Sequence, residues 1–195
     1  MSKIQIDEVD VSALDRYASI SIAFQIRSIY RVELINDGLG GMQFMEEPVV
    51  PYIKDYDMTL DGNPLRWPTH FDIRNWGFFL ASHGPQLIGA ATLAFNTSGV
   101  NMLEGRSDLS VLWDIRIQSE FRRQGVGRQL YKEALAWSRS KGCRQMKIET
   151  QNINVPACKF YQQMGCRLGE IHRFAYTTES DCASEVMLNW YMDIQ

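Results

Sequence analysis

The sequence lacks any long hydrophobic run. No apolar stretch of the 195-residue chain approaches the ~20 residues that a helix needs to span a bilayer. The N-terminal residues Met-Ser-Lys-Ile-Gln-Ile-Asp also lack the apolar stretch of a signal peptide. From these absences we expect no membrane partner and a cytoplasmic protein.

The sequence has no excess of basic charge either. Its 20 Lys and Arg residues stand against 23 Asp and Glu residues, which gives a net charge of −3. Non-specific nucleic-acid binding depends on neutralising many phosphates, so we expect no nucleic-acid partner. The hydrophobic share of 45% is ordinary for a globular protein, and no linker or repeat interrupts the chain. We therefore expect one domain over residues 1–195, with a core of its own.

Cysteine and histidine are scarce and are not spaced as metal ligands. The four cysteines show no paired CxxC spacing, and none of the three histidines is placed near them. We expect no metal, and we interpret the cysteines as small buried residues; they are Cys143, Cys158, Cys166 and Cys182.

The pattern of apolar residues predicts a mixed α/β fold, in which antiparallel hairpins flank a central βαβα core. The predicted helices cover residues 12–36, closed by Asp37-Gly38 and Gly40-Gly41, then 126–140 and 155–164. The stretch 42–75 carries four prolines and is predicted to be a long loop. The predicted strands cover residues 3–9, 76–82, 87–95, 109–117, 145–150, 166–176 and 183–192.

A basic, glycine-containing loop lies between the strand 109–117 and the helix 126–140. The first N–H groups of a helix have no partner within the helix and carry the positive end of its dipole, so they can hold a phosphate. Glycine allows a tight turn and the close approach of a phosphate, and the three arginines add positive charge. A basic surface turn is the alternative reading of this loop. Its residues are Arg122, Arg123, Gln124, Gly125, Val126, Gly127 and Arg128.

A second group of residues follows the strand 145–150. Asn154 is placed to cap a helix whose first turn tolerates Pro156. Tyr161 lies seven residues beyond Asn154, about two helical turns along, so that its hydroxyl could face a ligand on that helix. On helix geometry alone, Asn154 could be a plain cap and Tyr161 a core aromatic.

The two motifs, taken in this order, resemble the acetyl-CoA motifs of the GNAT N-acetyltransferase superfamily. The resemblance rests on Asp114-Ile115-Arg116-Ile117, on Arg122-x-x-Gly125-x-Gly127, and on Asn154-x-x-Ala157-x-x-Phe160-Tyr161-x-x-x-Gly165. Within the superfamily the chain is similar to streptothricin acetyltransferases, through Glu149-Thr150-Gln151 and through Pro51-Tyr52-Ile53-Lys54-Asp55-Tyr56. The segments 59–73 and 96–107 do not share this similarity.

The resemblance implies a GNAT-like mixed sheet, splayed at the site of acetyl-CoA, and direct transfer of the acetyl group to an amine. It implies that the amides of Gln124 to Arg128 bind the pyrophosphate, that the backbone of Ile115 and Ile117 meets the pantetheine arm, and that Asn154 and Ala157 belong to the same site. Tyr161 would protonate the departing thiolate.

The general base stays open among several carboxylates. We favour Asp114, although strand alternation alone does not say which way it points; Asp55, Asp57, Glu120 and Glu149 are the other candidates.

The acceptor is the least determined part of the prediction. A cationic amine would suit the carboxylates and aromatic rings of the 51–57 segment, and the candidate contacts are Tyr52, Asp55, Tyr56 and Asp57. We expect a small primary amine, with a streptothricin-type antibiotic as the specific hypothesis. A protein or peptide amine and a non-catalytic acyl-CoA sensor are the alternatives, and the chain is expected to be a monomer or a homodimer.

Overall fold

A computed structural model describes residues 4–59, 62–176 and 182–194 of the chain. These residues form two compact units. The first unit contains residues 1–24, 55–147 and 193–195, and the second contains residues 25–54 and 148–192. Strand β7 (Gln145–Gln151) begins in the first unit and ends in the second. A single domain over 1–195 stays a prediction.

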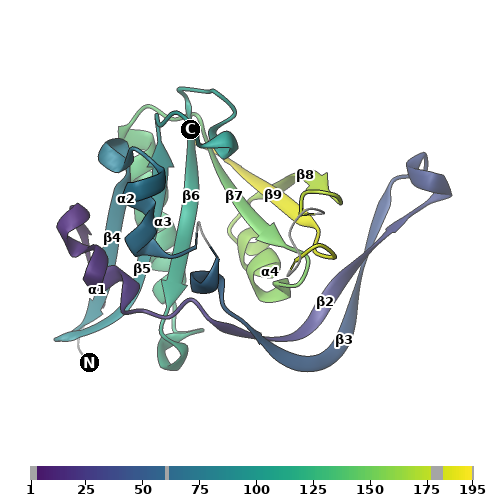
Figure 1. The fold of residues 1–195 in the computed structure, drawn as a ribbon, viewed down its shortest axis with the longest axis horizontal. Helices are drawn as coiled ribbons and strands as arrows, with labels where there is room; N and C mark the ends of the chain where they lie inside the picture. Colours follow the sequence, from purple (N-terminus) through teal and green to yellow (C-terminus); the bar gives the residue numbers. More distant parts are fainter. Residues whose placement is uncertain (1–3, 60–61, 177–181, 195) are drawn as a thin grey trace. The chain divides into compact units, whose positions relative to one another are not determined.

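The first unit is built on a sheet in which four antiparallel strands lie in the order β1-β4-β5-β6, with β7 next to β6 (Figure 1). The backbone amide of Arg144 donates a hydrogen bond to the carbonyl of Asp108, 2.8 Å away, so the first residues of β6 and β7 lie side by side. Two parallel strands joined by a helix require this arrangement, and the predicted mixed α/β fold is confirmed. The antiparallel strands are β1 (Ile4–Val9), β4 (Gly77–His83), β5 (Gln86–Phe95) and β6 (Leu109–Ile117).

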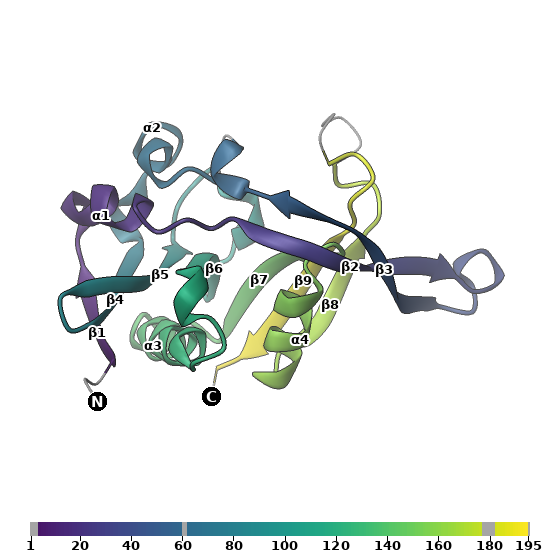
Figure 2. The same ribbon diagram turned by 90° about the horizontal axis from the view of Figure 1, so that it is seen from below.

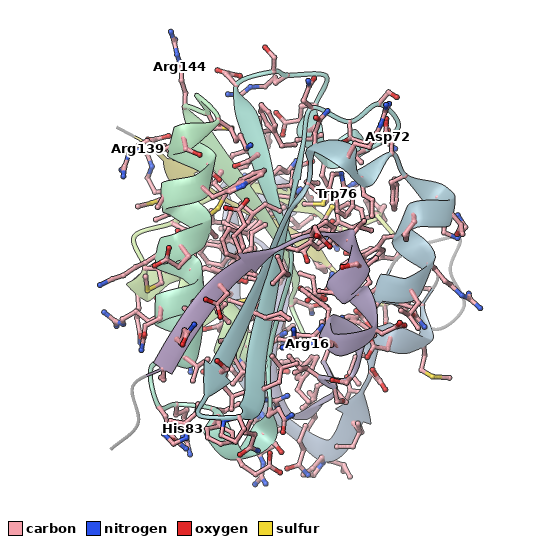
Figure 3. All side chains as sticks on the ribbon, turned by 90° about the vertical axis from the view of Figure 1, so that its left-hand side faces the viewer. Arg16, Asp72, Trp76, His83, Arg139 and Arg144 are labelled. Carbon is pink, nitrogen blue, oxygen red and sulfur yellow. The ribbon has the colours of Figure 1, made fainter. Side chains whose placement is uncertain are left out.

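Helices cover both faces of this sheet (Figure 3). Helix α3 (Val126–Ser140) packs on one face, against β4, β5 and β6. A Cβ added to Gly89 on β5 would lie 3.1 Å from the side chains of Val126 and Leu130, so glycine lets the first turns of α3 approach the sheet closely. The other helices of the first unit are short: α1 (Leu14–Ala18) and α2 (Trp67–His70). Its 3-10 turns are Val11–Ala13, Tyr56–Met58, Pro64–Arg66, Ile73–Asn75, Asn101–Leu103 and Ser119–Phe121.

Aromatic side chains fill the space between the sheet and α1 and α2. Trp67 is fully buried, and its ring lies 5.5 Å from Tyr17 and 6.0 Å from Trp76. Burial of such rings is worth several kcal/mol each by area, roughly 25 cal/mol per Å². This core fixes α1, and with it Tyr17, against the central strands.

The second unit combines a long hairpin with a small sheet. Strands β2 (Phe24–Leu34) and β3 (Met42–Lys54) form a twisted two-stranded ribbon, whose first residue belongs to the first unit (Figure 2). The last residues of β7 continue into the order β7-β9-β8, with β8 (Arg167–His172) antiparallel to β9 (Met187–Asp193). Helix α4 (Val155–Gln163) connects β7 to β8.

The predicted helix over 12–36 is wrong beyond its first turns. Helix α1 ends at Ala18, and Phe24–Leu34 is a strand. Apolar residues in FQIRSIYRVEL alternate with polar ones at period two, which is a strand signal, while a few of them also recur near the helical period by coincidence. Asp37-Gly38 and Gly40-Gly41 belong to the turn of the hairpin, closed by a 3-10 turn at Asn36–Gly38, and do not end a helix.

The predicted long loop 42–75 is also wrong in its first third, because Met42–Lys54 is a strand that contains Pro48 and Pro51. A two-stranded ribbon has free edges on both sides, where proline is tolerated. The strands predicted over 166–176 and 183–192 are shorter than expected, because residues 173–176 and 182–184 form turns. In the part of the chain that is described, no helix is both long enough and apolar enough to cross a membrane.

Candidate functional site

The loop between β6 and α3 has the conformation that an anion site needs. Gly125 is the N-cap of α3 and has a φ of 88°, a left-handed value that glycine adopts without strain. Within the described residues no side chain caps this helix. The first N–H groups of a 15-residue helix are therefore left for another acceptor, with the positive end of the helix dipole behind them.

Arg122 stabilises the backbone of this loop. Its Nε donates to the carbonyl of Ile117 at 3.0 Å, and its Nη2 donates to the carbonyl of Ala23 at 2.7 Å. The side chain is partly buried, and burial lowers the pKa of its guanidinium. Arg122 thus ties the start of the loop to the end of β6, whereas direct contact with a phosphate would require these bonds to be exchanged.

Four of the other predicted phosphate ligands lie at the surface. Gln124 donates from Nε2 to the carbonyl of Glu120 at 2.6 Å, which closes the loop on itself. Arg123 has a φ of 60°, so the backbone reverses just before the helix. Val126 is buried and anchors the first turn of α3 in the core, while the exposed residues of the loop are Arg123, Gln124, Gly125 and Arg128, with Gly127 half-buried.

Asn154 caps α4 in the second unit. Its Oδ1 accepts a hydrogen bond from the amide of Ala157 at 3.2 Å, and its carbonyl accepts one from the amide of Cys158 at 3.1 Å. Pro156 occupies the first turn, where a missing N–H is harmless. The predicted cap is confirmed, and the predicted contact of Asn154 and Ala157 with a cofactor stays a prediction.

Two reactive side chains of α4 are buried. Tyr161 is 4% exposed, and its ring lies 5.2 Å from that of Phe160. Burial raises the pKa of the Cys158 thiol to about 11, so at neutral pH Cys158 is a neutral thiol and a poor nucleophile. Its neighbour Thr150, on β7, accepts a hydrogen bond from the indole of Trp190 at 2.8 Å. The neutral thiol of Cys158 is therefore unsuited to form a covalent intermediate.

The remaining cysteines differ in burial. Cys143 and Cys166 are buried as predicted, whereas Cys182 is partly exposed, so the expectation of burial is wrong for that residue. Among the described residues no group of three or more His, Cys, Asp and Glu side chains could hold a metal ion.

Asp114 is buried in a network of hydrogen bonds on β6. The Tyr17 hydroxyl donates to its Oδ1 at 2.6 Å, and Arg116 donates from Nε to Oδ1 at 2.9 Å and from Nη2 to Oδ2 at 2.7 Å. Burial, and then the Asp114 charge, raise the pKa of Tyr17 well above its usual value, so Tyr17 stays a donor. The structure settles the direction of Asp114: it faces Tyr17, and the half-buried Ile115 and Ile117 alternate with it along the strand.

The predicted acceptor residues divide between the two units. Asp55 caps the turn Tyr56–Met58 by accepting from the amide of Asp57 at 3.0 Å, and the Tyr56 ring lies 5.7 Å from Phe24. Asp57 lies 3.1 Å from Nη1 of Arg116, and burial raises the pKa of its carboxyl. The structure therefore brings Asp57 and Asp114 to one guanidinium. Tyr52, on β3, is 44% exposed.

The sequence did not predict two sets of contacts. Arg116 was only part of a motif, although its spacing of two from Asp114 on a strand signals a shared face. In the second unit, Glu149 accepts hydrogen bonds from the Tyr176 hydroxyl and from Nε2 of Gln151, which also donates to Tyr176. Tyr176 lies 25 residues beyond Gln151, and no spacing in the sequence indicates this contact.

Comparisons with known proteins agree with these features. The model of the acetyltransferase (GNAT) family matches residues 43–166, well over half of the chain. A streptothricin acetyltransferase of Escherichia coli is 29% identical over 168 residues, covering 86% of this chain and 84% of that protein. Another, from Streptomyces lavendulae, is 22% identical and covers 73% of this chain and 70% of that protein.

Solved structures show the same fold. A protein of Bacillus anthracis str. Ames, provisionally named a streptothricin acetyltransferase and solved in complex with acetyl coenzyme A, is 25% identical; the match has a TM-score of 0.76 and covers 98% of this chain and 99% of that one. A nourseothricin acetyltransferase structure is 22% identical, with a TM-score of 0.75 and the same coverage. The uncapped N terminus of α3, the capped α4 and these matches lead to one conclusion: the chain belongs to the GNAT acetyltransferase family and is an acetyl-CoA-dependent N-acetyltransferase.

Proposed function

We propose that the chain transfers the acetyl group of acetyl-CoA directly to a primary amine of a small cationic acceptor, and that a streptothricin-type antibiotic is such an acceptor. The observation that carries the proposal is the surplus of carboxylate around Arg116, where Asp57 and Asp114 share one guanidinium. The surplus negative charge of these carboxylates attracts a cation. The similarity to streptothricin acetyltransferases over most of the chain supports the same class of acceptor.

A protein amine is the second candidate. A ribosomal-protein-S18-alanine N-acetyltransferase of Escherichia coli shares the fold, with a TM-score of 0.63 at 14% identity. That likeness concerns the fold alone, and the excess of carboxylate favours the small cation.

The first chemical requirement is a neutral amine. An alkylammonium has a pKa near 10.4, so forming its nucleophilic form at neutral pH costs about 4 to 5 kcal/mol. The amine nitrogen then attacks the thioester carbonyl, a C–N bond forms, and the C–S bond breaks as the thiolate leaves. The ammonium proton passes to a base, and the departing sulfur takes a proton from an acid.

Tyr161 is the proposed acid. A thiol has an unperturbed pKa near 8.5, so a hydrogen bond from a phenol stabilises the thiolate as it forms. Tyr161 is almost fully buried on α4, and a donor in such surroundings acts more strongly than one in water.

Two carboxylates are proposed for the base. Asp114 accepts hydrogen bonds on both of its oxygens, from Tyr17 and from Arg116. Glu149 is half-buried at the end of β7, and it accepts hydrogen bonds from the Tyr176 hydroxyl and from Nε2 of Gln151. A proton on Asp114 would weaken its charge-assisted contact with Arg116, which counts against Asp114 as the base.

The acceptor is tested by incubating the protein with acetyl-CoA and streptothricin. We expect release of CoA thiol and an acetyl group, a mass increase of about 42 Da, on one amine of the antibiotic. A peptide beginning with alanine serves as the parallel acceptor. Turnover of the peptide without turnover of streptothricin would reject the antibiotic and favour a protein amine.

The role of the acid is tested by Tyr161→Phe. We expect the single-turnover rate to fall by about 100-fold, the usual contribution of a positioned acid, while acetyl-CoA affinity stays near that of the native protein. Tyr131→Phe is the matched control, because it removes the hydroxyl of a buried helical tyrosine on α3. An unaltered single-turnover rate in Tyr161→Phe would remove this residue from the mechanism.

The two candidate bases are separated by pH profiles of kcat/KM for the acceptor. A base works only when deprotonated, so the rate falls on the acid side as it takes a proton. We expect Glu149→Gln to lower kcat by about 100-fold and to abolish this acid limb, and Asp114→Asn to keep it. The reverse pattern, with the limb kept in Glu149→Gln and lost in Asp114→Asn, would make Asp114 the base.

A further inference from the structure

Arg116 is a fully buried charge, with 0% exposure of its side chain. It lies on β6, and its guanidinium lies 5.2 Å from the centre of the Tyr17 ring. Its forked contact with both oxygens of Asp114 satisfies two of its five N–H groups. A buried cation needs partners for its remaining N–H groups. The contacts of these groups therefore show which other segments Arg116 binds.

The remaining donors reach two other segments of the first unit. Nη1 donates to the carbonyl of Ile20 at 2.9 Å, just after α1, and Nη2 lies 3.4 Å from the carbonyl of Gly62. Nη1 also lies 3.1 Å from Oδ1 and 3.3 Å from Oδ2 of Asp57. One guanidinium thus holds Asp57 and Gly62 against the central strand.

The charges in this cluster do not balance. Arg116 contributes one positive charge, and Asp57 and Asp114 contribute two negative charges when ionised. The Tyr17 hydroxyl is already committed to Asp114. The side chain of Asp57 is 24% exposed against 4% for Asp114, so the surplus negative charge reaches the surface at Asp57.

Asp57 is also incompletely satisfied. Its Oδ1 is buried and accepts no well-aligned hydrogen bond from the described residues, although Nη1 of Arg116 is close. Burial raises the pKa of the Asp57 carboxyl, Asp114 and Asp55 raise it further, and Arg116 opposes them. Arg116 therefore favours the ionised form of Asp57. Because Arg116 is shared with Asp114, its single positive charge does not neutralise both carboxylates.

We infer that Arg116 is a positioning residue that holds Asp57 for a second cationic group of the acceptor, one that is not the reacting amine. The reacting nitrogen must lose its proton, and an ion pair with Asp57 would instead hold that proton in place. Asp57 therefore suits an ammonium or guanidinium elsewhere on the acceptor. The preferred acceptor carries at least two basic groups. This inference rests on the proposed function, because only a cationic acceptor uses such a carboxylate.

The coupling of the two residues is tested without any acceptor by carboxyl ¹³C NMR. Asp57→Asn assigns the Asp57 signal. We expect Arg116→Gln to raise the pKa of Asp57, because it removes the nearest cation, and Arg116→Lys to raise it less. Arg106→Gln is the matched control: Arg106 also pairs with an aspartate two residues away, at 2.9 Å, but is 34% exposed. An Asp57 pKa that is the same in Arg116→Lys, Arg116→Gln and the native protein would overturn the inference.

The effect on the acceptor is tested by kinetics with streptothricin. A lost charge-assisted contact weakens binding by about tenfold or more, so we expect Asp57→Asn to raise the KM of the acceptor by that factor with little change in kcat. Arg116→Lys should raise KM less than Arg116→Gln, and adding Asp57→Asn to Arg116→Gln should add little. A merely structural role for Arg116 would lower thermal stability without this non-additivity, and additive effects would therefore contradict the inference.

Further outcomes separate this inference from the proposed function. Absence of thiol release with streptothricin in the native protein would reject the proposed acceptor. The charge requirement is then decided by titrating spermidine and butylamine into the native protein. A shift of the Asp57 carboxyl signal with spermidine that is absent with butylamine, smaller in Arg116→Lys and lost in Arg116→Gln supports the need for two basic groups. An equal response to the two amines would overturn it. Arg116→Gln leaves the buried Asp114 without its cation, and this variant can fail to fold. In that case the other two variants decide the question, because Asp57→Asn retains the pair of Arg116 and Asp114 and Arg116→Lys places a lysine beside Asp114.

Discussion

Helix α3 begins without a side-chain cap in the described part of the chain, and several residues of the first unit hold its N terminus in place. Gly125 supplies the left-handed turn, Gly89 lets the first turns of α3 approach β5, and Arg122 ties the loop to β6. Helix amides that no side chain satisfies require water or an anion. The fold therefore presents a set of N–H donors whose geometry comes from the backbone.

The acceptor side follows a different physical rule. In the proposed function the acceptor is bound by charged side chains, which come from separate segments that meet at Arg116. A buried ion pair contributes little to stability on balance, because desolvation offsets most of the attraction. We interpret the buried Arg116 as a residue that fixes the position of Asp57. Because Arg116 is shared by two carboxylates, the cluster keeps one surplus negative charge. In this account the backbone selects the donor, and the charge around Arg116 selects the acceptor.

The sequence predicted those parts in which local signals agree. The strand Leu109–Ile117 and the helix Val126–Ser140 were found with their observed bounds, because apolar periodicity, glycine and the strand-to-helix order coincide there. The strand Phe24–Leu34 was mistaken for helix, because a few apolar residues fit both periods and the turn glycines resemble a helix end. The alternation at period two and the pairing with Met42–Lys54 in the ribbon together identify the strand. Arg116 could not be assigned a role, since its partners Ile20 and Asp57 are distant in sequence.

The most direct test of the account is the response of backbone amides to acetyl-CoA. In ¹⁵N-labelled protein, acetyl-CoA is predicted to shift the amide signals of Gln124 to Arg128, while pantetheine, which has no pyrophosphate, leaves them in place. Saturable binding of acetyl-CoA that leaves these five amides unchanged would contradict the claim that the N terminus of α3 holds the donor.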